Sequence, residues 1–213
     1  HDILGKCIAI LGMRGSGKTN TAAVLVEELL SNNVPLSVID VDGEYWTLQE
    51  KYDIIRAGTT KDSEIVIPTF NIAESIRYIK AIARLSIRHK IPLVMDLSDF
   101  TLDNAKLLLE AYMKTLWEEA RKVRHPYFIV LEEAHEFIPQ KVSSPLKEQL
   151  TRIALRGRKR GLGLILISQR SAKVEKDVLT QAEMLFLHKV VHPADLRVYK
   201  ELLPMDPSQI SNI

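Results

Sequence analysis

Short apolar runs alternate with longer amphipathic stretches from one end of the chain to the other. The runs are rich in Ile, Val and Leu and contain few polar residues, which is typical of strands buried on both faces of a parallel sheet. The stretches between them repeat apolar residues at helical spacing, as expected for helices that connect such strands. The pattern therefore predicts an α/β fold, with a mostly parallel sheet and helices on both of its faces.

The apolar runs place strands at 6–11, 36–42, 92–97, 127–132, 163–168 and 184–188. The amphipathic stretches place helices at 17–31, 72–88, 102–123, 145–157 and 194–202. Residues 43–70 have no clean periodicity and are interpreted as a connection with room for a short strand at 64–67. Because no linker divides the chain, residues 1–213 are expected to form a single domain.

Composition and charge exclude several classes of protein. The 213-residue chain is long enough to bury a core, and its net charge of +2 is too small to indicate a nucleic-acid partner by itself. Cys7 is the single cysteine, which excludes a disulfide framework and a multi-cysteine metal site. No apolar stretch approaches the roughly 18 residues that span a bilayer and no signal peptide opens the chain, so we expect a soluble cytoplasmic protein.

A phosphate-binding loop is the strongest motif. Gly12-Met-Arg-Gly-Ser-Gly-Lys-Thr19 fits the P-loop pattern Gly-x-x-x-x-Gly-Lys-Ser/Thr and lies between a predicted strand and a predicted helix. Lys18 is expected to contact the β- and γ-phosphates of ATP, and Thr19 to ligate Mg²⁺. The alternative, a plain glycine-rich turn, is weaker because both sequence and context match. The predicted nucleotide contacts in this motif are Gly12, Gly15, Ser16, Gly17, Lys18, Thr19 and Asn20.

Two glutamates follow the predicted strand 127–132 and its apolar run. Glu132 is predicted to hold the Mg²⁺ through water, and Glu133 to orient and polarise the attacking water. The alternative is that both carboxylates are solvated and favoured by the dipole of a helix that starts there. The apolar run directly before them argues against this alternative.

Polar side chains also end two other predicted strands. Asp40 and Asp42 close the strand in VIDVDGEY, at the edge where ligands bind in open α/β sheets. Asp40 is the better candidate for a nucleotide contact, although a turn-forming acid before Gly43 is nearly as good an interpretation. Gln169 follows GLILIS and is predicted to sense the γ-phosphate, with an ordinary polar residue at a strand end as the alternative.

Basic residues gather between 147 and 176. The cluster consists of Lys147, Arg152, Arg156, Arg158, Lys159, Arg160, Arg170, Lys173 and Lys176. It fits an arginine finger, a contact with DNA phosphates or a solvated helix face, and the last is the usual outcome. The glycines around Arg158 would let its guanidinium project past the edge of the subunit. His135, Trp46 and Trp117 are interpreted as packing or capping residues.

Four segments of the chain resemble the HerA branch of the HerA/FtsK superfamily of ATP-driven DNA pumps. They are HDILGKCIAILGMRGSGKTN, VIDVDGEY, IVLEEAHEFIP and GRKRGLGLILISQR, of which EEAH-x-F-x-P and GRK-x-G…SQR are the distinctive parts. The resemblance implies a RecA-like P-loop NTPase core in a hexameric ring, with ATP between subunits and duplex DNA through the pore. It assigns Lys18 and Thr19 to the nucleotide and Mg²⁺, Glu132 to the metal and Glu133 to the attacking water. It assigns Gln169 to sensing of the γ-phosphate and Arg158 to the neighbour's site. More loosely, it assigns Asp40 to the nucleotide site.

The resemblance implies an ATP-hydrolysing motor that translocates or unwinds double-stranded DNA, in repair or end processing. The N-terminal β-barrel usual in HerA proteins is not in this chain, and binding of a partner nuclease is attributed to regions outside the core. A viral genome-packaging ATPase or a conjugation or secretion motor shares the same core and remains an alternative. A nucleotide switch that hardly hydrolyses ATP is a further alternative, against which the pair Glu132-Glu133 argues.

Overall fold

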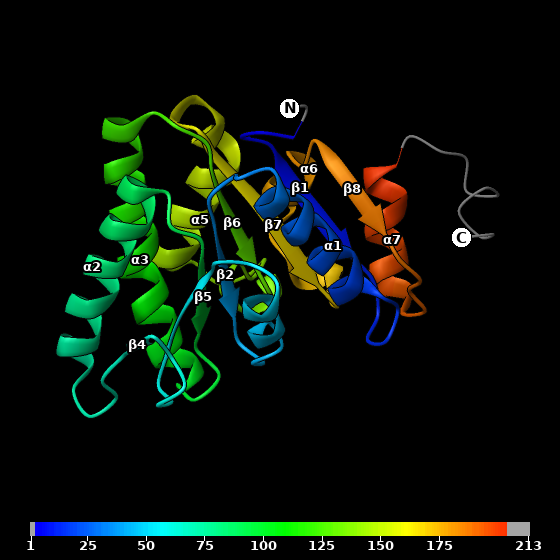
Figure 1. Ribbon diagram of the computed structural model, residues 1–213. Helices are drawn as coiled ribbons and strands as arrows, with labels where there is room; N and C mark the ends of the chain where they lie inside the picture. The colour runs from blue at the N-terminus through cyan, green and yellow to red at the C-terminus, as the bar shows by residue number, and fades with distance from the viewer. Residues whose placement is uncertain (1–2, 204–213) are drawn as a thin grey trace.

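A single parallel sheet runs through the computed structural model, which describes residues 3–203 (Figure 1). Its strands are β1 (Cys7–Leu11), β2 (Leu36–Asp40), β3 (Ile55–Gly58), β4 (Ile65–Val66), β5 (Leu93–Asp96), β6 (Tyr127–Leu131), β7 (Leu162–Ser168) and β8 (Met184–Leu187). They lie in the order β4-β3-β5-β2-β6-β7-β1-β8, and each neighbouring pair is parallel. The predicted α/β class and parallel sheet are confirmed.

The helices are α1 (Lys18–Ser31), α2 (Ile72–His89), α3 (Leu102–Val123), α4 (Ala134–Phe137), α5 (Pro145–Arg156), α6 (Lys176–Thr180) and α7 (Pro193–Leu202). Short 3₁₀ helices are η1 (Trp46–Glu50), η2 (Gly157–Arg160) and η3 (Ser171–Lys173). Three of the long helices, α2, α3 and α5, begin with a side-chain N-cap. The capping residues are Asn71, Thr101 and Ser144, whose side chains accept hydrogen bonds from backbone N–H groups of the first helical turn. None of the helices within residues 3–203 combines the length and the hydropathy that a membrane-spanning helix requires.

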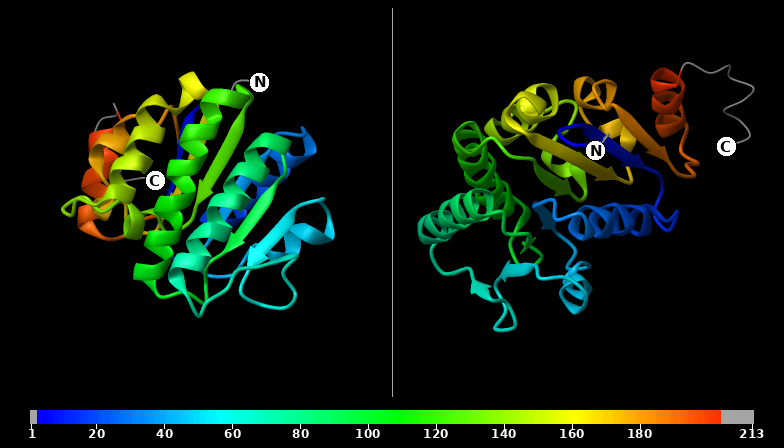
Figure 2. Two further views of the ribbon diagram at one scale, coloured as in Figure 1. Left: turned by 90° about the vertical axis from the view of Figure 1, so that its left-hand side faces the viewer. Right: turned by 45° about the horizontal axis from the view of Figure 1, so that its top comes forward.

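Helices cover both faces of the sheet, as predicted, but unequally (Figures 1 and 2). One face packs against α1, and the inward residues of β1 on this side are Ile8 and Ile10. The other face packs against α2, α3 and α5, and further along against α6 and α7. Alternate strand residues supply the two cores, which explains why the central strands are apolar almost throughout.

The sequence pattern missed one strand. The short strand expected at 64–67 is confirmed as β4, but β3 lies inside the stretch interpreted as a connection. β3 has the sequence IRAG and contains Arg56, so no apolar run marks it. Pairing with β5 defines it, and the Arg56 guanidinium lies 2.6 Å from the Asp96 carboxylate at the end of that strand.

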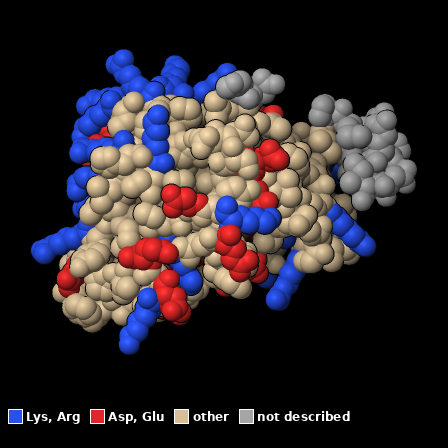
Figure 3. Space-filling view, in the orientation of Figure 1, with Lys and Arg blue, Asp and Glu red and all other residues tan. Residues whose placement is uncertain are grey.

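The parallel sheet separates the candidate residues onto two edges, one formed by the carboxyl ends of the strands and the other by their amino ends. The P-loop follows β1, the two glutamates follow β6 and Gln169 follows β7, which lies between those strands. The carboxyl ends of all three strands meet on one edge, so these residues are brought together. Arg158 lies in η2, before β7, on the opposite edge. Lys and Arg side chains gather there, over the end of α3 and η2, at the upper left of Figure 3.

Candidate nucleotide-binding site

The P-loop forms a cradle at the start of α1. Gly17 is the N-cap of that helix with φ 96°, a left-handed conformation that glycine adopts without strain. A Cβ on Gly12 would lie 2.5 Å from the Cβ of His188, so only glycine fits there. The Ser16 hydroxyl is buried and has no hydrogen-bond partner among the described residues. A helix start with an unpaired hydroxyl beside it suits an anion such as a nucleotide phosphate.

Lys18 opens α1 and lies folded back into the loop. Its side chain is 8% exposed, and Nζ donates to the backbone oxygen of Met13 over 3.0 Å. Burial lowers the pKa of Lys18 from its usual value, and the negative charges of Glu133, Glu132 and Glu44 oppose that shift. The ammonium group therefore lies in the field of several carboxylates, next to the predicted phosphate position. Thr19 and Asn20 follow in the first turn of the same helix.

Glu132 is a buried carboxylate at the end of β6. It is 8% exposed and accepts a hydrogen bond from the Tyr45 hydroxyl. Burial raises the pKa of Glu132 to about 7, while the bond from Tyr45 lowers it and the charges of Glu133 and Asp40 raise it. A cation would stabilise the ionised form at this place. Carboxylate and hydroxyl oxygens, such as those of Glu132 and Thr19, are the donors that Mg²⁺ takes.

Glu133 adopts an unusual backbone conformation directly after Glu132. Its φ is 45°, in the left-handed region that non-glycine residues rarely occupy, and it caps the short helix α4. One carboxylate oxygen lies 3.0 Å from Nδ1 of His135, without the alignment of a hydrogen bond. The same ring nitrogen lies 3.3 Å from the hydroxyl of Ser168, the last residue of β7. His135 therefore packs at the start of α4, which agrees with its interpretation as a packing residue, and it also contacts Ser168 at the end of β7.

A small cavity of about 200 Å³ opens beside Glu133. Its polar lining comes from Asp42, Glu133, Glu136 and Gln169, and its apolar lining includes Phe100 and Leu97. Gln169 and Glu133 therefore line one cavity, because they follow the neighbouring strands β7 and β6. Glu133 is therefore one of three acidic residues at the wall of this cavity, with Asp42 and Glu136.

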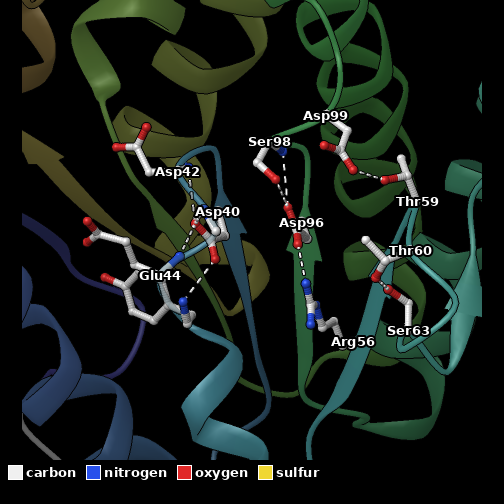
Figure 4. Close-up of polar contacts among 12 residues, drawn as sticks. Asp40, Asp42, Glu44, Arg56, Thr59, Thr60, Ser63, Asp96, Ser98 and Asp99 are labelled. Carbon is white, nitrogen blue, oxygen red and sulfur yellow. Dashed lines mark hydrogen bonds and ion pairs between the residues drawn. The ribbon is translucent and has the colours of Figure 1, made fainter.

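Asp40 has the turn-forming role that was its alternative interpretation (Figure 4). Its carboxylate accepts from the backbone N–H groups of Asp42 at 3.3 Å, Gly43 at 2.7 Å, Glu44 at 3.2 Å and Tyr45 at 3.0 Å. Both carboxylate oxygens are used by these bonds. A contact between Asp40 and nucleotide therefore stays a prediction, and what the structure adds is that Asp40 organises the loop after β2.

Three residues near the site were missed by sequence reasoning. Tyr45 and Glu44 stand in the quoted segment VIDVDGEY, where only the aspartates were considered. His188 ends the predicted strand 184–188 and contacts the P-loop through both ring nitrogens, with Nδ1 2.9 Å from the Ser16 backbone oxygen and Nε2 3.1 Å from the Thr21 hydroxyl. The sequence offered one signal for each of two of them, because Tyr45 follows the predicted strand 36–42 and His188 ends the predicted strand 184–188.

Arg158 is not part of its own chain's site. Its guanidinium lies 3.0 Å from Glu183, whose other oxygen accepts from the N–H of Cys7 at the start of β1. These are the amino ends of the strands, at the edge opposite the P-loop. The Arg158 side chain is 70% exposed, so it is free to meet another molecule.

The packing interpretation holds for one tryptophan. Trp117 is 7% exposed, and the guanidinium groups of Arg152 and Arg160 lie 4.5 Å and 4.0 Å from its ring centroid. Trp46 is 52% exposed, so it was wrongly interpreted as a packing residue. It lies at the start of η1, directly after Tyr45.

Solved structures of other proteins share this fold. The DNA-packaging ATPase B204 of Sulfolobus Turreted Icosahedral Virus matches with a TM-score of 0.63 and 17% identity, over 99% of this chain and 89% of that chain. VirB4 of Thermoanaerobacter pseudethanolicus matches with a TM-score of 0.62 and 14% identity, over 96% of this chain and 82% of that chain. At these identities the likeness concerns the fold alone, and it agrees with the predicted α/β fold.

Curated relatives match by sequence. A probable DNA double-strand break repair helicase HerA of Methanocaldococcus jannaschii is 28% identical over 148 residues, which is 68% of this chain and 28% of that protein. The DNA double-strand break repair helicase HerA of Pyrococcus furiosus is 32% identical over 99 residues, 45% of this chain and 18% of that protein. This chain thus spans less than a third of the length of either relative. The family described as "Helicase HerA, central domain" matches residues 1–160, and the chain therefore belongs to the HerA central-domain family.

Proposed function

We propose that the chain is the ATP-hydrolysing core of a ring-shaped motor that translocates or unwinds double-stranded DNA in repair or end processing. The observation that carries the proposal is the P-loop on β1 beside the paired glutamates of β6 at one sheet edge. Family membership supports DNA as the object moved, because the HerA relatives are named as double-strand break repair helicases. The likenesses to packaging and VirB4 proteins concern the fold, so they do not favour a packaging or secretion role.

ATP and Mg²⁺ fit the donor groups of the site. The backbone N–H groups of the P-loop, the unpaired Ser16 hydroxyl and the Lys18 ammonium would hold the phosphates. Thr19 and Glu132 would hold Mg²⁺, which when bound neutralises charge on the phosphates. We assign these residues to binding, and the neighbouring Glu133 to chemistry.

The water-activating role falls to Glu133. Its carboxylate borders the small cavity, and we assign it to orient a water molecule and accept its proton. Gln169 lines the same cavity and would sense the γ-phosphate from β7. Arg158 would complete the site of a neighbouring subunit in a homo-hexamer. A nuclease partner would bind outside this core.

The test separates binding from chemistry. Lys18→Ala is expected to lose nucleotide binding or turnover, whereas Glu133→Gln is expected to bind ATP with Mg²⁺ and hydrolyse it at least about 100-fold more slowly, the usual range for a general base. Turnover is measured as phosphate release with and without linear duplex DNA, and binding with a fluorescent ATP analogue. Glu28→Gln, an exposed acid on α1, is the matched control and should behave like the unchanged chain.

Two outcomes would contradict the proposal. Normal turnover by Glu133→Gln would remove that residue from catalysis. An unchanged chain that binds ATP but releases no phosphate, with or without DNA, would favour the nucleotide switch.

A further inference from the structure

We propose that Tyr45 is a positioning residue that holds the Glu132 carboxylate in place for the metal. The inference rests on the proposed function, in which Glu132 is the metal-side acid. Tyr45 touches neither nucleotide nor metal in this assignment, and it acts through Glu132. It lies on the loop after β2, whereas Glu132 follows β6, the neighbouring strand in the sheet. The loop after β2 therefore fixes the acid at the end of β6.

The loop is built so that the Tyr45 hydroxyl points at Glu132. The Asp40 carboxylate accepts hydrogen bonds from the backbone N–H groups of the four residues that follow Val41. The last of these donors is the N–H of Tyr45, 3.0 Å from Oδ2 of Asp40. Gly43, with φ 74°, supplies the left-handed turn that this curled path needs. Asp40 therefore sets the loop, and the loop sets the direction of the tyrosine side chain.

The ring of Tyr45 is fixed as firmly as its backbone. The side chain is 3% exposed and packs in the core under α1, together with Leu48 and Ile54. A ring held in this way cannot follow Glu132 if the carboxylate turns. Its hydroxyl is then a fixed donor, and the carboxylate oxygen Oε1 that accepts from it is held with it.

Glu132 needs such a donor more than most carboxylates. It is buried, and Glu133, Asp40 and Glu44 place negative charge around it. Among the side chains of residues 3–203, Tyr45 is the one that donates a hydrogen bond to Glu132. The Tyr45 bond occupies one oxygen of Glu132 and leaves the other for a metal-bound water. Loss of a group that orients a metal ligand typically weakens metal binding about 10- to 100-fold.

The experiment measures metal binding directly. Mn²⁺ is titrated into the chain with a non-hydrolysable ATP analogue, and free Mn²⁺ is followed by electron paramagnetic resonance. Tyr45→Phe, which removes one hydroxyl and keeps the ring, is expected to bind Mn²⁺ about 10-fold more weakly or worse. Its affinity for the analogue without metal should stay unchanged, and its melting temperature should fall slightly, because the buried Glu132 carboxylate loses one hydrogen bond. Tyr52→Phe is the matched control, because it removes a hydroxyl that contacts only Ser31 among the described residues, at 3.2 Å.

A double-mutant cycle tests the path through Glu132. Glu132→Gln removes the charge, and in that background Tyr45→Phe should have no further effect on Mn²⁺ affinity. Three results would overturn the inference: unchanged Mn²⁺ affinity in Tyr45→Phe, equal weakening of metal-free analogue binding, or additive losses in the double variant. Unchanged Mn²⁺ affinity in Glu132→Gln would instead overturn the metal assignment under the proposed function, and with it the task given to Tyr45.

Discussion

At the scale of single residues, His188 braces the P-loop from the edge strand β8. One ring nitrogen contacts the Ser16 backbone oxygen and the other the Thr21 hydroxyl. A neutral imidazole satisfies both contacts, since one nitrogen donates to the carbonyl and the other accepts from the hydroxyl. The backbone N–H of Met13 also donates to Lys189, at 2.9 Å, so the loop is held to this segment twice.

We therefore expect His188→Leu to weaken nucleotide binding. Two neutral hydrogen bonds contribute about 1 to 2 kcal/mol together, which corresponds to roughly tenfold in affinity. Titration with a fluorescent ATP analogue measures the change. His89→Leu, at the exposed end of α2, is the control for adding an apolar side chain. Equal affinities for His188→Leu and the unchanged chain would show that the loop holds its shape without the histidine.

The residues found from the sequence are those whose neighbours along the chain define the motif. Lys18 is placed by the glycines before it, and Glu132 and Glu133 by the apolar run before them. Tyr45 meets Glu132 across 87 positions of sequence, and His188 meets the P-loop across 172. No local pattern announces such contacts, because only the strand order brings these residues together.

At the scale of elements, α2 and α3 are joined by a buried acid. Glu119 of α3 is 3% exposed, and its carboxylate lies 2.7 Å from Arg88 of α2 and 2.8 Å from Lys122. Hydrogen bonds from Arg88 and then Lys122 lower the pKa of Glu119 to about 2. The folded state therefore favours the ionised carboxylate more than the unfolded state does.

The sign of the pH dependence follows from this lowered pKa. The stabilisation is complete above the unfolded pKa of 4.5 and is lost as the pH falls through about 2. Glu119→Gln should cost about 1 to 2 kcal/mol at neutral pH, a modest value because Arg88 and Lys122 are half exposed and screened by solvent. Urea denaturation over a pH series measures it. Glu118→Gln, an exposed neighbour, should show no such loss, and a Glu119→Gln deficit that persists undiminished at pH 2 would contradict the assignment.

The elements were predictable where their own residues determine them. Long helices such as α2 and α3 have an apolar stripe and a capping residue, and the central strands have unbroken apolar runs. β3 has neither, because it has four residues and includes Arg56. Its strand conformation comes from pairing with β5, which no window of the sequence contains.

At the scale of the whole molecule, the two edges of the sheet carry different chemistry. The carboxyl edge holds the P-loop and the paired glutamates, and the amino edge holds η2 with Arg158 and its basic neighbours. Basic composition between 147 and 176 was readable from the sequence. The position of Arg158 at the edge opposite its own P-loop also follows once the sheet is parallel, because Arg158 precedes β7 whereas the P-loop follows β1.

Because Arg158 lies at the edge opposite its own P-loop, we propose that it acts in the site of another chain. Its ion pair with Glu183 is 3.0 Å long, and the two side chains are 70% and 37% exposed, so it contributes little stability and does not prevent Arg158 from moving. An arginine supplied across an interface is worth about 10³- to 10⁵-fold in rate. Arg158→Ala should therefore bind ATP and be nearly inactive, whereas the control Lys159→Ala, next to it in η2, should keep most of its activity.

Mixing two inactive variants tests whether Arg158 acts in trans. In an assembly of Arg158→Ala and Glu133→Gln chains, a site with Glu133 from the first and Arg158 from the second has both groups. Phosphate release should then return in part, with a maximum at intermediate mixing ratios, and native mass spectrometry confirms that mixed assemblies have formed. If Arg158 served its own chain, each site would lack one of the two groups at any ratio. Mixed assemblies without recovered turnover would therefore refute the trans assignment and leave Arg158 as part of a solvated basic edge.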